Sequence, residues 1–125
     1  MKRVMVFGTF DGVHAGHRAF LKEARMHGDH LIVVLPLDHI VEQLKGRMPK
    51  VSLAERVNAL KTEDGVNEVV IGDERLGVWE VVKSHRPEVI AVGYDQHALK
   101  EDLENHLGEI GYTPEIKVMH SYEKS

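Results

Sequence analysis

The chain has 125 residues, of which 42% are hydrophobic and 29% charged, and its formal net charge at pH 7 is −4. These values predict one globular domain over residues 1–125 and give no general attraction to nucleic acid. There is no cysteine, which excludes disulfides and zinc–thiolate sites. No apolar run reaches membrane-spanning length, and Met1-Lys2-Arg3 leads directly into an apolar strand. We therefore expect a cytoplasmic protein with neither a membrane nor a nucleic-acid partner.

Apolar runs of strand length alternate with segments of helical periodicity along the chain. Gly28, the capping-box pair Ser52 and Glu55, and Pro87 mark boundaries between them. This alternation predicts an α/β, Rossmann-like fold with a doubly wound, five-stranded parallel sheet and helices on both faces. In chain order we predict strand 4–7, helix 15–27, strand 30–35, helix 38–44, helix 53–61, strand 68–71, helix 76–85, strand 89–92, helix 97–110 and strand 115–119.

In a sheet of this kind the ligand binds at the carboxyl ends of the strands. Residues 8–17 follow the first strand there and read Gly-Thr-Phe-Asp-Gly-Val-His-Ala-Gly-His. The glycines allow close approach of the backbone to an anion at a helix N-terminus. His14 and His17, three residues apart, share one face of the first helical turn and form a compact donor site for phosphate oxygens. The P-loop lysine and the GxGxxG spacing are both absent.

Gly8-Thr9-Phe10-Asp11 followed by His14-Ala15-Gly16-His17 resembles the signature of the HxGH nucleotidyltransferase superfamily. This superfamily includes cytidylyltransferases, phosphopantetheine adenylyltransferases and FAD synthases. The resemblance implies a single nucleotidyltransferase domain in which the acceptor phosphate attacks the α-phosphorus of a nucleoside triphosphate and pyrophosphate leaves. It also implies Mg²⁺ bridging the nucleotide phosphates, with no metal site made by the protein itself.

Lys45, Arg47 and Lys50 lie in a loop that contains glycine and proline. Flexible cations suit the charge that develops on the β- and γ-phosphates, and Lys-Gly-Arg-x-Pro resembles the phosphate-gripping loop of several superfamily members. The alternative is an ordinary solvated basic loop. Arg56 falls where relatives carry an arginine in the next helix, and the alternative there is a surface helix arginine.

Gly93-Tyr94-Asp95-Gln96 follows the fourth strand, where the family has Gly-x-Asp in contact with the ribose or the acceptor. Asp11 and Asp38 also end near the predicted crevice, and Asp11 could orient a substrate or water-bound magnesium. The alternative for Asp95 and Asp38 is that they cap the helices that follow them. Relatives carry a serine- and threonine-rich segment after the last strand, of which Ser125 is the matching residue.

These observations give a set of candidate residues, assigned by the role that the resemblance implies. They are, as catalytic residues, His14, His17 and Lys45; as nucleotide-binding residues, Gly8, Thr9, Phe10, Gly16, Arg47, Gly93, Asp95 and Ser125; and, as acceptor-binding residues, Asp11, Asp38, Arg56 and Tyr94.

Four stretches point to the substrates. Phe-Asp-Gly-Val-His resembles the adenylyltransferase part of bacterial FAD synthases. Short archaeal FAD synthases are resembled by three further stretches, which are the basic loop, Gly-Tyr-Asp-Gln and Pro114-Glu-Ile-Lys-Val. The C-terminal cysteines of those archaeal enzymes are absent. The resemblance implies adenylyl transfer from ATP to FMN. The alternatives are cytidylyl transfer from CTP to glycerol 3-phosphate and, in a different class, a nucleotide-binding module without turnover. Relatives are often dimers, so a homodimer is expected.

Overall fold

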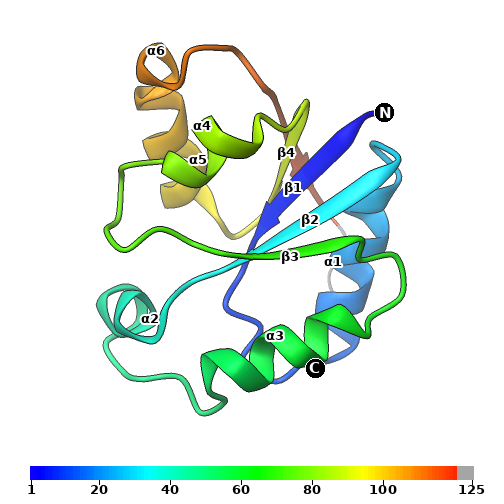
Figure 1. The fold of residues 1–125 in the computed structure, drawn as a ribbon, viewed down its shortest axis with the longest axis vertical. Helices are drawn as coiled ribbons and strands as arrows, with labels where there is room; N and C mark the ends of the chain where they lie inside the picture. The colour runs from blue at the N-terminus through cyan, green and yellow to red at the C-terminus, as the bar shows by residue number, and fades with distance from the viewer. Residues whose placement is uncertain (121–125) are drawn as a thin grey trace.

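The computed structural model describes residues 1–120, in which five parallel strands form one sheet with helices on both faces (Figure 1). The predicted fold class is confirmed. Of the helices in this part of the chain, none has both the length and the apolar character that a membrane span requires. The elements are β1 (Arg3–Phe7), α1 (Ala15–Arg25), β2 (His30–Leu35), α2 (Asp38–Lys45), α3 (Leu53–Lys61), β3 (Glu68–Ile71), α4 (Glu80–His85), β4 (Val89–Gly93), α5 (His97–Asn105), α6 (Leu107–Ile110) and β5 (Glu115–Met119).

The strand order β3-β2-β1-β4-β5 places β1 at the centre of the sheet. The chain runs outward from β1 through β2 to β3 and then returns to the opposite side of β1 with β4. The carboxyl ends of β1 and β4 therefore flank a topological switch point, which is where open α/β sheets bind their ligands.

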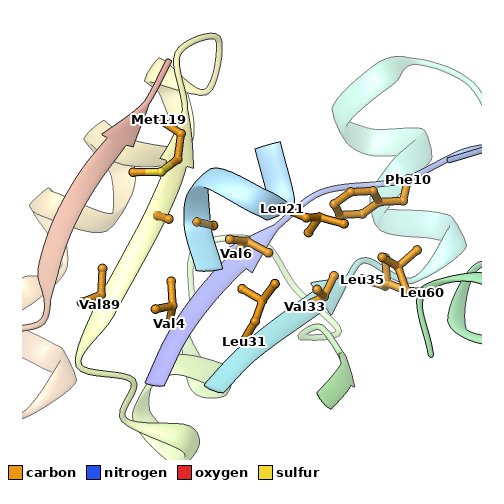
Figure 2. Packing of buried hydrophobic residues seen from close by; sticks show 12 residues of the cluster. Val4, Val6, Phe10, Leu21, Leu31, Val33, Leu35, Leu60, Val89 and Met119 are labelled. Carbon is orange, nitrogen blue, oxygen red and sulfur yellow. The ribbon is translucent and has the colours of Figure 1, made fainter. Parts of the chain in front are cut away.

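The core among residues 1–120 divides between the two faces of the sheet because successive side chains of a strand point in opposite directions. Val4 and Val6 lie on one face with Leu21 of α1 and Leu60 of α3 (Figure 2). Met5 lies on the other face, in a cluster with buried side chains of α4, α5 and α6. Each fully buried aliphatic side chain of this kind contributes about 1.5–3 kcal/mol. Burial on both faces explains the uninterrupted apolar strands.

The segment predicted as one helix over 97–110 is two helices, α5 and α6, separated at His106. The prediction of a continuous helix is wrong because the His106 side chain replaces a main-chain hydrogen bond. Its Nδ1 donates to the Asp102 carbonyl at 2.7 Å, while its backbone N–H donates to the Leu103 carbonyl instead. A side chain that competes for a helical carbonyl in this way interrupts the helix.

The segment predicted as a helix from residue 76 is helical only from Glu80. Trp79 precedes α4 with a φ of 55°, in the left-handed region that an α-helix does not use. The indole Nε1 of Trp79 donates to Asp102 at 2.9 Å, which holds the buried ring against α5. The Asp73 carboxylate accepts from the backbone N–H of Glu80 at 2.9 Å and so takes up a free donor at the first turn.

Gly28 offers a test of how closely the turn after α1 approaches the sheet. A Cβ at Gly28 would lie 2.6 Å from the Lys2 carbonyl oxygen and 2.6 Å from a methyl group of Val4. We expect Gly28→Ala to lower the free energy of unfolding by about 1–3 kcal/mol, because the Lys2 carbonyl is part of the backbone and cannot move away from the added methyl group. Urea denaturation measures this change. The matched control is Gly108→Ala in α6, where a Cβ would meet nothing within 4 Å and where alanine should maintain or raise stability. Equal stability of the two variants would contradict the close approach.

Candidate active site

The loop after β1 is shaped by Phe10, whose side chain is buried in the core although its φ of 51° is left-handed. The ring turns back over Gly8, where a Cβ would lie 2.6 Å from the Phe10 Cε2 atom. It also lies 4.8 Å, between ring centroids, from the imidazole of His17. A left-handed non-glycine residue is strained, and such strain persists where the surroundings hold it in place. The buried phenyl ring therefore fixes both the loop and one face of His17.

The side chains of His14 and His17 together cap the N-terminus of α1. The Nδ1 atom of His14 accepts from the backbone N–H of Gly16 at 3.0 Å, and the backbone N–H of His14 donates to Nδ1 of His17 at 3.2 Å. The two rings are stacked, with their centroids 3.8 Å apart. Because Nδ1 is the acceptor in each neutral ring, the proton of each lies on Nε2. The cap therefore does not use the Nε2–H donor of either ring, although a ring N–H of His17 also interacts with the Gly12 backbone.

The His17 ring is held neutral at physiological pH. Burial, with smaller contributions from His14 and Lys45, lowers the pKa of His17 to about 4, although a hydrogen bond to the Gly12 backbone opposes the shift. Protonation of Nδ1 at lower pH removes the acceptor that receives the His14 N–H. A neutral ring therefore keeps the cap intact.

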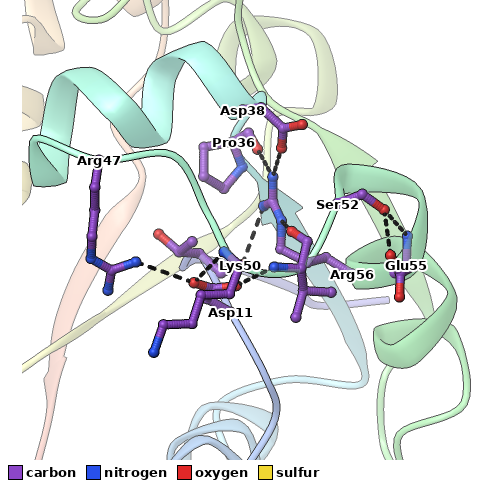
Figure 3. Close-up of polar contacts among 10 residues, drawn as sticks. Asp11, Pro36, Asp38, Arg47, Lys50, Ser52, Glu55 and Arg56 are labelled. Carbon is purple, nitrogen blue, oxygen red and sulfur yellow. Dashed lines mark hydrogen bonds and ion pairs between the residues drawn. The ribbon is translucent and has the colours of Figure 1, made fainter.

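Arg56 is fully buried and links three segments at the carboxyl edge of the sheet (Figure 3). Its guanidinium donates to the carbonyls of Thr9 at 3.2 Å, Pro36 at 2.9 Å and Val51 at 3.1 Å. It also donates to the Asp38 carboxylate at 2.7 Å. The arginine thus joins the loop after β1, the loop after β2 and the start of α3. Contact of Arg56 with an acceptor remains a prediction, whereas its part in shaping the site is a feature of the fold.

Asp11 fastens the basic loop to the loop after β1 (Figure 3). Its carboxylate accepts from the backbone N–H of Lys50 at 2.9 Å and of Val51 at 2.7 Å, and Arg47 lies 3.6 Å away. These N–H groups, with a smaller contribution from Arg47, lower the pKa of Asp11. The contact is therefore complete at neutral pH and weakens only as the pH falls through that lowered value. We call these contacts of Asp11 the loop latch.

The turn after β4 is organised by Gln96, a residue to which the sequence pattern gave no role. The backbone N–H of Gly93 donates to its Oε1 at 2.7 Å, and its Nε2 donates to the carbonyl of Phe7 at 2.9 Å. Asp95 folds back over Gly93, where a Cβ would be 2.9 Å from an Asp95 oxygen. Tyr94 is 45% exposed beside it.

The alternative prediction, that Asp95 and Asp38 cap the helices that follow them, is wrong. The residue at the N-cap of α5 is Gln96, one position after Asp95, and no side chain caps that helix. The N-cap of α2 is Leu37, and Asp38 is instead bonded to Arg56. Neither Asp95 nor Asp38 therefore serves as a helix cap.

The candidate residues within 1–120 gather at the carboxyl edge of the sheet. Direct contacts join their segments: Asp11 to Lys50, Arg56 to Thr9, and Gln96 to Phe7. Ser125 lies outside the described residues. A hollow of about 400 Å³ opens beside the end of β3, and among its lining residues are Gly72 and Arg75.

The paired imidazoles lie beside a helix N-terminus at the topological switch point, which is where an α/β protein of this topology binds a ligand, and the residues that carry them resemble the HxGH signature. Residues 5–123 match the family model described as cytidylyltransferase-like, and the chain belongs to this family. It is accordingly a nucleotidyltransferase.

Two relatives of this chain are FAD synthases. The chain is 46% identical over 105 residues to the FAD synthase of Thermococcus sibiricus, covering 81% of this chain and 71% of the relative. It is 42% identical over 123 residues to the FAD synthase of Pyrococcus horikoshii, covering 98% and 83%.

Solved structures agree on the fold. The lipopolysaccharide core biosynthesis protein of Thermoplasma volcanium superposes with a TM-score of 0.88 at 30% identity, covering 98% of this chain and 99% of the other. Pantoate–β-alanine ligase from Francisella tularensis has a TM-score of 0.68 at 13% identity, covering 98% and 60%, which is a likeness of fold alone.

Limited proteolysis tests the loop latch. Asp11→Ala removes the acceptor of the Lys50 and Val51 N–H groups, so the basic loop should open more often and expose its cleavable bonds. We expect trypsin to cut after Lys45, Arg47 or Lys50 about tenfold faster than in the wild type. Asp64→Ala, which removes an exposed carboxylate beyond α3, is the control. Equal cleavage rates for Asp11→Ala and the wild type would show that the latch does not hold the loop.

Proposed function

We propose that the protein is an FMN adenylyltransferase, an FAD synthase that transfers AMP from ATP to FMN and releases pyrophosphate. One observation carries the proposal. Two imidazoles whose rings are oriented by the helix cap lie at the switch point, and the chain that holds them is 42% identical to an FAD synthase over 98% of its length. The acceptor is a phosphate ester that is already ionised at neutral pH. No general base is therefore needed.

In the proposed reaction, an oxygen of the FMN phosphate forms a bond to the α-phosphorus of ATP. The bond between that phosphorus and the bridging oxygen to the β-phosphate breaks, and its electron pair leaves with pyrophosphate. His14 and His17 donate their Nε2–H groups to α-phosphate oxygens as negative charge accumulates there. The Thr9, Phe10 and Gly16 backbone and the N-terminus of α1 complete the phosphate cradle.

The basic loop would bind the β- and γ-phosphates. Lys45 and Arg47 supply the charge, and Arg47 exchanges its contact with Asp11 for the more highly charged triphosphate. Among residues 1–120, no three histidine, aspartate or glutamate side chains are grouped so that they could hold a metal ion, and the Asp11 oxygens already accept backbone N–H groups. Magnesium, which the family resemblance implies, would arrive with the ATP phosphates and would supply positive charge to neutralise the leaving pyrophosphate.

The turn after β4 would recognise the nucleoside and the flavin. Asp95 can accept hydrogen bonds from two ribose hydroxyls, and the exposed ring of Tyr94 can contact a flat heterocycle. Asp38 and Arg56 would belong to the part of the site that binds the acceptor. In the same proposal, residues 1–125 act as one domain. The proposal also includes assembly as a homodimer and a cytoplasmic location.

Product analysis tests the assignment directly. The protein incubated with ATP, FMN and Mg²⁺ should release pyrophosphate and form FAD, because the site binds a triphosphate beside an aromatic side chain. Chromatography of the flavins measures the product, and CTP with glycerol 3-phosphate is the comparison reaction. CDP-glycerol without FAD would identify a cytidylyltransferase, and binding of nucleotide with neither product would identify a non-catalytic module.

The two nitrogen atoms of each imidazole allow capping and catalysis to be separated. His17→Asn places an oxygen near the position of Nδ1 and retains the cap acceptor, but it lacks the Nε2–H donor. His17→Gln does the reverse. We expect the asparagine variant to lose about 10²–10³-fold in kcat with a near-normal Tm, and the glutamine variant to retain more activity with a lower Tm. The same pair of changes applies to His14. Near-normal kcat in both asparagine variants would exclude the proposed donor role.

A further inference from the structure

The carboxyl ends of β1 and β4 are joined by a side chain and not by the strand ladder. β1 remains paired with β2 as far as Phe7 and Val34, whereas its pairing with β4 ends one step earlier, at Val6 and Ala91. The Gln96 amide bonds to the Gly93 N–H and the Phe7 carbonyl just beyond that point. The two strands therefore separate at the switch point, and Gln96 bridges the opening.

The bridge requires a carboxamide in one orientation. The Gly93 N–H can only donate and the Phe7 carbonyl can only accept, so Oε1 must face the former and Nε2 the latter. A leucine would leave both partly buried backbone groups without this partner. An ionised glutamate would place a negative oxygen against the Phe7 carbonyl. Protonated glutamic acid could restore both contacts, since it carries one carbonyl acceptor and one O–H donor.

The two ends of the bridge lie where the two halves of the proposed substrate site begin. Phe7 directly precedes Gly8 and the loop of the imidazole donors, and Gly93 directly precedes Tyr94 and Asp95. We propose that Gln96 is a positioning residue that sets the distance between the α-phosphate loop and the turn that binds the ribose and the acceptor. This inference rests on the proposed function and extends it to a residue that touches neither reacting atom.

A ligand that spans both loops should depend on the bridge, and a ligand that uses only one should not. ATP reaches from the imidazole donors to the turn after β4, whereas inorganic tripolyphosphate needs only the phosphate loop and the basic loop. In Gln96→Leu we expect ATP to bind about tenfold more weakly and tripolyphosphate to bind within about twofold of the wild type. We also expect kcat with FMN to fall by about 10²-fold, because a displacement near 1 Å misaligns the reacting groups.

Isothermal titration with each ligand measures the two affinities, and thermal unfolding shows whether each variant is folded. Asn105→Leu is the matched control, since it removes an exposed amide from the other end of α5. Gln96→Glu provides a second variant. The ratio of its kcat/KM to that of the wild type should rise as the pH falls, because protonation rebuilds the bridge.

Parallel loss of ATP and tripolyphosphate affinity in Gln96→Leu would overturn the inference and indicate a general structural role, as would a flat pH ratio for Gln96→Glu. Unchanged ATP affinity in Gln96→Leu would also overturn it. Wild-type protein that binds ATP and makes no FAD would contradict the proposed flavin acceptor alone. The comparison of ATP with tripolyphosphate uses no acceptor, so it would still decide the role of Gln96.

Discussion

The buried guanidinium of Arg56 is the interaction on which the arrangement of the site depends. A cation removed from water is costly unless hydrogen bonds and an opposite charge surround it. Here the carbonyls of Thr9, Pro36 and Val51, with the Asp38 carboxylate, meet that requirement. None of these groups can move far without leaving the charge unsatisfied. The loops after β1 and β2 are therefore held in one relative position before any ligand arrives.

The polar groups of the site form a graded series from buried and fixed to exposed and adaptable. Arg56 is inaccessible, Asp11 is 12% exposed, and Arg47 is 55% exposed. In the proposed reaction, the fixed groups would support the backbone that approaches the α-phosphate, and the exposed cation would change partners as a triphosphate enters. This gradient suits a reaction whose catalysis depends on preorganised donors and on neutralising a departing polyphosphate.

Most of the fold could be predicted because its signals are local and repeated: apolar strands, a capping box and glycines at turns. The gathering of the HxGH loop, the loop after β2 and the Gly-Tyr-Asp-Gln turn followed from the parallel topology alone. The helix break at His106, the latch at Asp11 and the bridge at Gln96 could not be predicted in this way. Each is a bond from a side chain to a backbone group, and residue type or periodicity does not indicate where such a bond forms. For Asp11, the sequence indicated the orientation of a substrate or of water-bound magnesium instead.

The histidine pair links the local folding of α1 to the chemistry of the site. The Nδ1 atoms that cap the first turn are on the same rings as the Nε2 atoms of the proposed donors, so opening of that turn would displace both donors together. Under the proposed donor role, the molecules in which this turn is open would be the same molecules in which the site cannot act. An anion bound by both rings must shift that population toward the closed turn by mass action. The rate of amide hydrogen exchange at Gly16, whose N–H bonds to His14, therefore reports the occupancy of the site through the backbone.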